Sequence, residues 1–200
     1  MAEPAPRAVF CFDLASPYAY LAAERISGIF AEAGAEQPEW QPVLVGALFA
    51  RFGRTSWGLT AEREAGIAEC ERRASAYGLP PFRWPEPWPG NSMKAMRAAI
   101  FAKQIGRSTS YTLAAFRQAF AAARDLTELD NVLIAAAAAE MHPRAVSQAV
   151  ERQAIKDELR TATEAAGDRG VFGVPSVIVG DEVFWGDDRL EAAAQAATRA

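Results

Sequence analysis

The sequence predicts an α/β protein with a βαβ unit at one end of the chain, a ββα unit at the other and a large helical segment between them. Short apolar runs with strand patterning occur near both ends of the 200-residue chain. The stretch 60–166 is rich in alanine and carries apolar residues at helical spacing. Residues 79–90 (LPPFRWPEPWPG) interrupt that stretch, and so many prolines cannot form regular structure.

The βαβ unit begins with a strand over 7–13, in which apolar residues occupy both faces, as in a strand buried on both sides. A helix over 18–33 follows at once. Ser16 and Pro17 are its start signal, because serine caps a helix and proline suits the first helical position. A second strand is predicted over 39–45, where apolar and polar residues alternate.

The ββα unit begins with a β-branched run over 174–179, followed by a Gly-Asp turn and a second strand over 182–185. This pattern predicts a hairpin. A final alanine-rich helix is predicted from Gly186 onward, with Asp187 and Asp188 in its first turn, where the helix dipole favours negative charge.

Five further helices are predicted in the central segment, at 92–104, 110–123, 128–141, 143–152 and 155–166. This order of elements is that of a thioredoxin fold with an all-helical insertion, the DsbA-like arrangement. We therefore predict a thioredoxin-like unit formed by residues 1–59 and 167–200, and a helical insertion formed by residues 60–166.

Composition excludes several classes of partner. The 21 basic and 25 acidic residues give a formal charge of −4, so we expect neither nucleic acid nor an anionic membrane surface as a partner. No window approaches the roughly 18 apolar residues of a membrane span. The start, MAEPAPRAVF, lacks the pattern of a signal peptide, and we expect a cytoplasmic protein.

The cysteine and histidine counts exclude two kinds of site. Cys11 and Cys70 are too far apart in sequence for a C-x-x-C motif, and His142 is the single histidine. We therefore expect no metal site and structural roles for both cysteines. His142 is expected on the surface, at a junction between helices.

Residues 12–21 (FDLASPYAYL) resemble the opening of 2-hydroxychromene-2-carboxylate isomerases and of their relatives, the kappa-class glutathione transferases. Further segments resemble the same family in the same order: 42–49, 91–97, 170–176 (GVFGVPS) and 184–190 (FWGDDRL). Each segment alone is a weak signal, but together they cover nearly the whole chain. The resemblance implies a glutathione cofactor, a small aromatic carboxylate or other electrophile as substrate, and a homodimer.

Ser16 is the predicted catalytic residue. Redox members of the wider superfamily carry C-x-x-C at this helix start, whereas this chain has Ser16 and Ala19, so dithiol exchange is excluded. A helix N-terminus stabilises a thiolate, and the resemblance implies that the Ser16 hydroxyl donates a hydrogen bond to the glutathione sulfur. The alternative is that Ser16 only caps the helix.

Val174, Pro175, Asp187 and Asp188 are the predicted glutathione contacts. The resemblance implies a cis-proline loop, in which the Val174 backbone pairs with the cysteinyl part of glutathione. Asp188 would accept from the ammonium group of the γ-glutamyl part, while backbone N–H groups of the turn bind its carboxylate. Asp187 is either a second contact or simply a residue of the helix start.

Pro17, Tyr18, Arg54 and Asn91 are the predicted substrate contacts. Relatives commonly carry a lysine and an asparagine between 49 and 55, where this chain offers Arg51 and Arg54. Arginine pairs well with a carboxylate, but the forked arrangement of N–H donors on its guanidinium differs from the donor and acceptor pair of an asparagine amide. Asn91 alternatively caps the helix that follows. The aromatic side chains Phe82, Trp84, Trp88 and Trp185 either wall a substrate pocket or pack in the core.

These assignments favour a glutathione-dependent isomerase that converts 2-hydroxychromene-2-carboxylate to trans-o-hydroxybenzylidenepyruvate in aromatic degradation. Two alternatives remain. A kappa-type transferase or peroxidase would use the same Ser16 site with another electrophile. A non-catalytic binding protein would keep the fold alone, although the joint presence of Ser16, Pro175 and Asp188 argues against it.

Overall fold

A computed structural model describes residues 7–199. Residues 1–6, on which part of the expectation about a signal peptide depends, lie outside the described residues, as does residue 200. The elements are β1 (Val9–Phe12), α1 (Pro17–Glu32), β2 (Glu39–Pro42), α2 (Val45–Arg51), the 3₁₀ helix η1 (Trp57–Leu59), α3 (Arg63–Ala76), α4 (Met93–Gln104), α5 (Ser108–Phe120), α6 (Leu129–Ala138), α7 (Pro143–Ala149), α8 (Gln153–Asp168), β3 (Ser176–Val179), β4 (Glu182–Trp185) and α9 (Leu190–Ala197).

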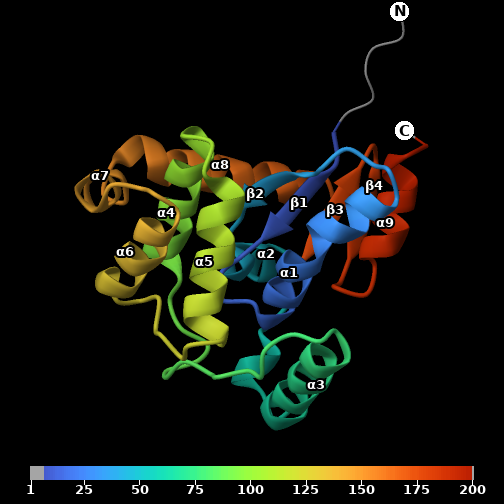
Figure 1. The fold of residues 1–200 in the computed structure, drawn as a ribbon, viewed down its shortest axis with the longest axis horizontal. Coiled ribbons are helices and arrows are strands. Elements are labelled where there is room, and N and C mark those ends of the chain that lie inside the picture. The colour runs from blue at the N-terminus through green and yellow to red at the C-terminus, as the bar shows by residue number, and fades with distance from the viewer. Residues whose placement is uncertain (1–6, 200) are drawn as a thin grey trace, which may run out of the picture.

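Four strands form one mixed sheet in the order β2-β1-β3-β4. β1 pairs in parallel with β2, so that Val9 lies opposite Glu39, and it pairs antiparallel with β3, so that Val9 also lies opposite Ile178. β3 and β4 form the antiparallel hairpin. This is the predicted thioredoxin fold, and Figure 1 shows the helices α4–α7 gathered to one side of the sheet.

The sheet is covered on both faces. Phe10 and Phe12 are fully buried in the larger core cluster, which includes residues of α1, α4, α5 and α9. Cys11 points to the opposite face and packs in a second cluster with Leu48 of α2 and Ala166 of α8. The prediction of a first strand buried on both faces is therefore confirmed.

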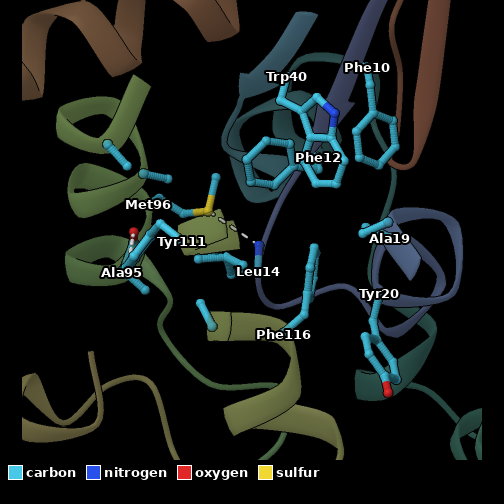
Figure 2. Packing of buried hydrophobic residues seen from close by; sticks show 14 of the residues in the cluster. Phe10, Phe12, Leu14, Ala19, Tyr20, Trp40, Ala95, Met96, Tyr111 and Phe116 are labelled. Atoms are coloured by element: carbon cyan, nitrogen blue, oxygen red, sulfur yellow. Dashed lines mark hydrogen bonds between the residues drawn. The ribbon is translucent and has the colours of Figure 1, made fainter. Parts of the chain in front are cut away.

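The helical insertion shares its core with the strand that leads to the predicted site (Figure 2). The ring centroids of Phe12 and Phe116 lie 6.2 Å apart, which joins β1 to α5. The Leu14 N–H approaches the Met96 sulfur at 3.2 Å, and the Tyr111 hydroxyl donates to the Ala95 carbonyl at 3.0 Å. The packing of α4 and α5 thus fixes the backbone just before the start of α1.

The five central helices occur where the sequence predicts them, with ends shifted by a few residues. Residues 79–90 carry no helix or strand. The division into units at 59/60 and 166/167 stays a prediction, and α8 runs across the second boundary. Within residues 7–199, every helix is too short or too polar to cross a membrane.

Two predicted boundaries are wrong. The second strand ends at Pro42 rather than residue 45, because Val45 begins α2, a helix that the strand-like alternation concealed. A buried carboxylate, Asp13, accepts from the Val45 N–H at 2.9 Å and holds this helix start. A sequence pattern of seven residues cannot reveal such a long-range acceptor.

The final helix begins at Leu190, not at Gly186. Residues 186–189 form a tight turn in which Gly186 has a φ of 118° and the Arg189 N–H donates to the Gly186 carbonyl at 3.3 Å. Asp187 and Asp188 therefore lie in the turn before α9, and the acidic residue of the first helical turn is Glu191.

Candidate active site

A cleft of about 1030 Å³ lies at the N-terminus of α1. Its walls come from the first turns of α2 and the loop after that helix, η1, the Pro/Trp-rich segment and the turns on either side of the β3–β4 hairpin. The cleft brings together all the residues that the sequence analysis assigns to the site: Ser16, Pro17, Tyr18, Arg54, Asn91, Val174, Pro175, Asp187 and Asp188. Their proximity is established, and their roles stay predictions.

Ser16 occupies the N-cap position of α1. Its Oγ accepts from the Ala19 N–H at 3.2 Å, and its hydroxyl lies 3.5 Å from the Val174 carbonyl oxygen. Pro17 has no N–H, and the Ala19 N–H is bound by Ser16, so Tyr18 supplies the remaining N–H of this first turn. A hydroxyl donor, an N–H and the positive end of the helix dipole converge on one point, which suits an anion.

The Val174–Pro175 peptide bond is cis. The loop that contains it faces Ser16, and the Gly186 N–H donates to the Pro175 carbonyl at 2.9 Å, which ties the loop to the turn before α9. The Val174 backbone and the 186–189 turn thus form one continuous edge of the cleft.

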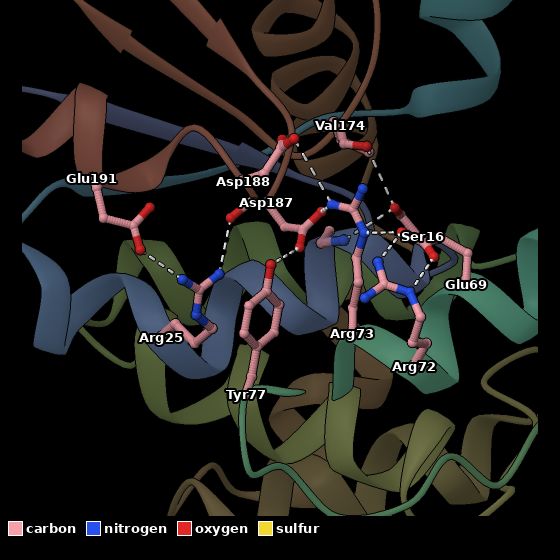
Figure 3. Close-up of polar contacts among 11 residues, drawn as sticks. Ser16, Arg25, Glu69, Arg72, Arg73, Tyr77, Val174, Asp187, Asp188 and Glu191 are labelled. Atoms are coloured by element: carbon pink, nitrogen blue, oxygen red, sulfur yellow. Dashed lines mark hydrogen bonds and ion pairs between the residues drawn. The ribbon is translucent and has the colours of Figure 1, made fainter. Parts of the chain in front are cut away.

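The two adjacent aspartates of this turn have different environments (Figure 3). Asp187 is 1% exposed and receives the Arg73 guanidinium at 2.7 Å and the Tyr77 hydroxyl at 2.9 Å, both from the α3 region. Burial raises its pKa, and the Arg73 charge opposes this rise. The side chain of Asp188 is 60% exposed, and its carboxylate lies 4.0 Å from Arg73. Asp188 is thus accessible to a ligand, with Arg73 at the limit of ion-pair distance, while Asp187 anchors α3.

Asp13 is a buried carboxylate at the end of β1 that the sequence analysis did not single out. Its Oδ1 accepts from the Ala15 N–H at 2.9 Å and the Ser92 hydroxyl at 2.8 Å, and its Oδ2 accepts from the Val45 N–H. Burial raises its pKa, against the effect of these three donors. Asp13 thereby connects the segments that precede α1, α2 and α4 directly beneath Ser16.

Aromatic side chains form the wall of the cleft opposite the hairpin. Trp57 contacts Trp88 at a centroid distance of 4.9 Å and meets the ring of Tyr18 edge-on at 6.0 Å. Trp57, in η1, is a site residue that the sequence analysis missed, because a lone tryptophan in a loop carries no signal of its partners. Trp84 and Phe82 lie outside the cleft and pack against Phe120.

Arg51 and Arg54, the two arginines between residues 49 and 55, lie in different surroundings. Arg54 lines the cleft, whereas Arg51 faces α8, donates to Asp168 at 2.8 Å and is absent from the cleft lining. Of the two arginines whose roles the sequence left open, only Arg54 therefore lies at the cleft. Asn91 lines the cleft, and its Oδ1 accepts from the Met93 N–H at 3.0 Å, just before α4, whose N-cap residue is Ser92; its substrate contact stays a prediction.

Both cysteines are buried in the described structure, and burial raises the pKa of each thiol to about 12. Such thiols stay protonated and make poor nucleophiles. His142 is exposed and caps α7 through its Nδ1, which accepts from the Arg144 N–H at 3.2 Å. These findings agree with structural roles for all three residues.

Adding a Cβ at Gly66 should displace the aromatic wall. A methyl group there would overlap the ring of Trp57, which is itself packed against Trp88. We expect Gly66→Ala to destabilise the fold by about 1–3 kcal/mol and to change tryptophan fluorescence. Urea unfolding and emission spectra measure both effects.

Gly28→Ala is the matched control, since Gly28 is exposed in α1 and an added Cβ meets no atom within 4 Å. It should stabilise the fold by about 0.5–1 kcal/mol, because alanine restricts the unfolded chain and favours the helix. Equal effects of the two substitutions would contradict the placement of Trp57.

A cap serine at the start of α1 beside a cis-proline loop defines a thioredoxin-fold protein whose active-site helix begins without a dithiol. The chain belongs to the DSBA-like thioredoxin domain family, whose sequence model matches residues 8–197.

Curated relatives within this family are isomerases. The 2-hydroxychromene-2-carboxylate isomerase of Sphingobium xenophagum is 26% identical over 91% of this chain and 93% of its own length. The Pseudomonas putida protein of the same name is 25% identical over 90% and 89%. The resemblance stated from the sequence is confirmed, and these relatives support an enzyme of the DSBA-like family.

Solved structures agree on the fold. A 2-hydroxychromene-2-carboxylate isomerase superposes with a TM-score of 0.83 and 22% identity, covering 97% of this chain and 95% of that one. A probable DsbA oxidoreductase from Streptomyces coelicolor gives a TM-score of 0.77, also at 22% identity, with 96% and 88% covered. At these identities the likeness establishes the DsbA-like thioredoxin fold alone.

Proposed function

We propose that this protein is a glutathione-dependent isomerase of 2-hydroxychromene-2-carboxylate or a closely related aromatic carboxylate. The names of its curated relatives support the reaction. The observation that carries the glutathione assignment is the convergence of the Ser16 hydroxyl, the Val174 carbonyl and the exposed Asp188 carboxylate along one cleft.

The residues present fit glutathione. The exposed Asp188 carboxylate suits an ammonium group, the cis-proline loop offers backbone groups to a peptide, and the helix N-terminus suits a thiolate. Ligand pockets usually measure about 300–1,000 Å³, so a cleft of about 1030 Å³ also has room for a second small molecule beside a tripeptide. The aromatic wall of Trp57 and Trp88 suits a planar second ligand.

When bound, glutathione supplies a thiolate nucleophile that is regenerated at the end of the reaction. Ser16 would hold the negative charge at that sulfur by hydrogen bonding, together with the N-terminus of α1. Asp188 and Val174 would fix the position of the tripeptide, and the aromatic wall would exclude water from the face where the substrate lies.

The proposal is tested by titrating glutathione calorimetrically into the purified protein and by following the isomerisation of 2-hydroxychromene-2-carboxylate with and without glutathione. We expect saturable binding and turnover that requires glutathione. Asp188→Asn should bind glutathione roughly tenfold more weakly, because the ammonium group loses its ionic partner. Asp181→Asn, exposed in the β3–β4 turn, is the charge-matched control and should bind as the wild type does.

Binding without isomerisation, but with conjugation of another electrophile, would favour the transferase alternative. Absence of binding would contradict the glutathione site and favour a non-catalytic thioredoxin-fold protein.

A further inference from the structure

Arg54 is placed at the mouth of the cleft by the way α2 ends. Gly53 adopts a φ of 63° directly after the helix, and the Arg54 N–H donates back to the Phe49 carbonyl at 2.8 Å. This is a Schellman-type helix end, which favours glycine at the left-handed position and reverses the chain. The local sequence therefore directs Arg54 toward the hairpin side of the cleft.

The guanidinium of Arg54 rests on two aromatic rings. Its Cζ lies 4.9 Å from the ring centroid of Phe172 and 4.9 Å from that of Trp185, and the two rings contact each other at 4.8 Å. Gly173 permits this arrangement, because a Cβ there would lie 2.9 Å from the Trp185 Nε1. A guanidinium held by its face keeps its in-plane N–H donors available, and less entropy is lost when they bind.

Arg54 has no acidic partner among the residues that the structure describes. By contrast, Arg73 deeper in the cleft is bound to Asp187 and Glu69. Trp185 is 44% exposed and lines the cleft beside Arg54. An arginine with free donors beside an exposed tryptophan is suited to a ligand that is both anionic and partly apolar.

The edge of the cleft formed by the Val174 backbone and the 186–189 turn indicates how a bound tripeptide would be oriented. If the ammonium end lies at Asp188, the neighbouring segment is Pro175, which is tied to that turn by the Gly186 N–H. The cysteinyl residue then lies beside Val174, opposite Ser16. The third residue continues past Val174 toward Gly173, whose neighbour Phe172 forms half of the aromatic platform.

We propose that Arg54, held on the Phe172–Trp185 platform, is a carboxylate receptor that binds the glycyl carboxylate of glutathione. This inference rests on the proposed function and adds to it a recognition element for the far end of the cofactor. The aromatic substrate also carries a carboxylate, which Arg54 could bind in the same way. The experiment must therefore distinguish binding of the glycyl carboxylate from binding of the substrate carboxylate.

The test compares Arg54→Gln with Arg51→Gln. Both remove one positive charge from the same short segment, but Arg51 pairs with Asp168 outside the cleft. Glutathione and γ-glutamylcysteine, which lacks the glycyl carboxylate, are titrated calorimetrically into each variant. The KM for 2-hydroxychromene-2-carboxylate is then measured at saturating glutathione.

We expect Arg54→Gln to weaken glutathione binding about tenfold and to leave γ-glutamylcysteine binding unchanged. Arg51→Gln should alter either affinity by less than about twofold. If Arg54→Gln instead raises only the KM for the aromatic substrate, the assignment to the glycyl carboxylate is overturned, and the carboxylate that Arg54 binds is that of the substrate.

If the wild type binds glutathione and Arg54→Gln changes neither the glutathione affinity nor the KM for the aromatic substrate, Arg54 is not a carboxylate receptor. The proposed function would then still stand. A wild type that does not bind glutathione would overturn both.

Discussion

Ser16→Ala should raise the pKa of the bound glutathione thiol by about one to two units, toward the value of about 8.5 for a free thiol. A hydrogen bond to a charged group contributes about 1.5–3 kcal/mol, and each pKa unit corresponds to about 1.4 kcal/mol. Because the thiolate fraction falls, isomerase turnover near neutral pH should fall about 10- to 100-fold. The ultraviolet absorbance of the thiolate, titrated with pH, measures the shift directly.

The same substitution removes a helix cap, since the Ser16 Oγ accepts from the Ala19 N–H. This loss should lower stability by about 1 kcal/mol. His142→Ala is the matched control: His142 caps α7, is also followed by a proline, and is absent from the cleft lining. It should lose a comparable amount of stability without moving the thiol pKa. A thiol that titrates at the same pH in Ser16→Ala and the wild type would refute the role of Ser16.

Asp13→Ala should destabilise the fold by roughly 3–5 kcal/mol, the largest effect that we expect on stability. Three donors lose their acceptor at once: the Ala15 and Val45 N–H groups and the Ser92 hydroxyl. Unsatisfied buried donors are costly, and these lie at the starts of separate segments. Urea unfolding measures the change, with Asp181→Ala, in the exposed β3–β4 turn, as the control.

The pH dependence of this effect has a definite sign. Burial raises the pKa of Asp13 in the folded protein above the ordinary value of 3.8. A carboxyl with a raised folded-state pKa contributes most below its unfolded pKa and loses that contribution as pH rises through the folded pKa. The destabilisation by Asp13→Ala should thus be larger below about pH 4 than at about pH 8. The opposite trend would show that the carboxylate form is the one favoured by folding.

Local patterns in the sequence were sufficient for the element order and for much of the site. Ser16 before Pro17 marks a helix start whatever lies around it, because capping and the fixed φ of proline act within one turn. The strand over 174–179 and the hairpin are likewise visible in the β-branched run and the Gly-Asp turn. The helical segment 60–166 follows from its apolar spacing alone.

Tertiary structure decided which side chains are available. Asp187 and Asp188 are identical neighbours in the sequence, yet only Asp187 is bound by Arg73 and Tyr77, which lie more than a hundred residues away. Arg51 and Arg54 are likewise similar in sequence but differ in their contacts. Arg51 pairs with Asp168, whereas Arg54 lies on the rings of Phe172 and Trp185.

The sequence by itself therefore determined the thioredoxin order of strands and helices, the helical insertion and a serine in place of a dithiol at the start of the first long helix. The start of α2, the anchoring of α3 at Asp187, the role of Asp13 and the wall formed by Trp57 were decided only by the tertiary structure. The physical reason is range: caps, turns and apolar periodicity act within a few residues, whereas burial, ion pairing and ring contacts depend on partners brought together by the whole fold.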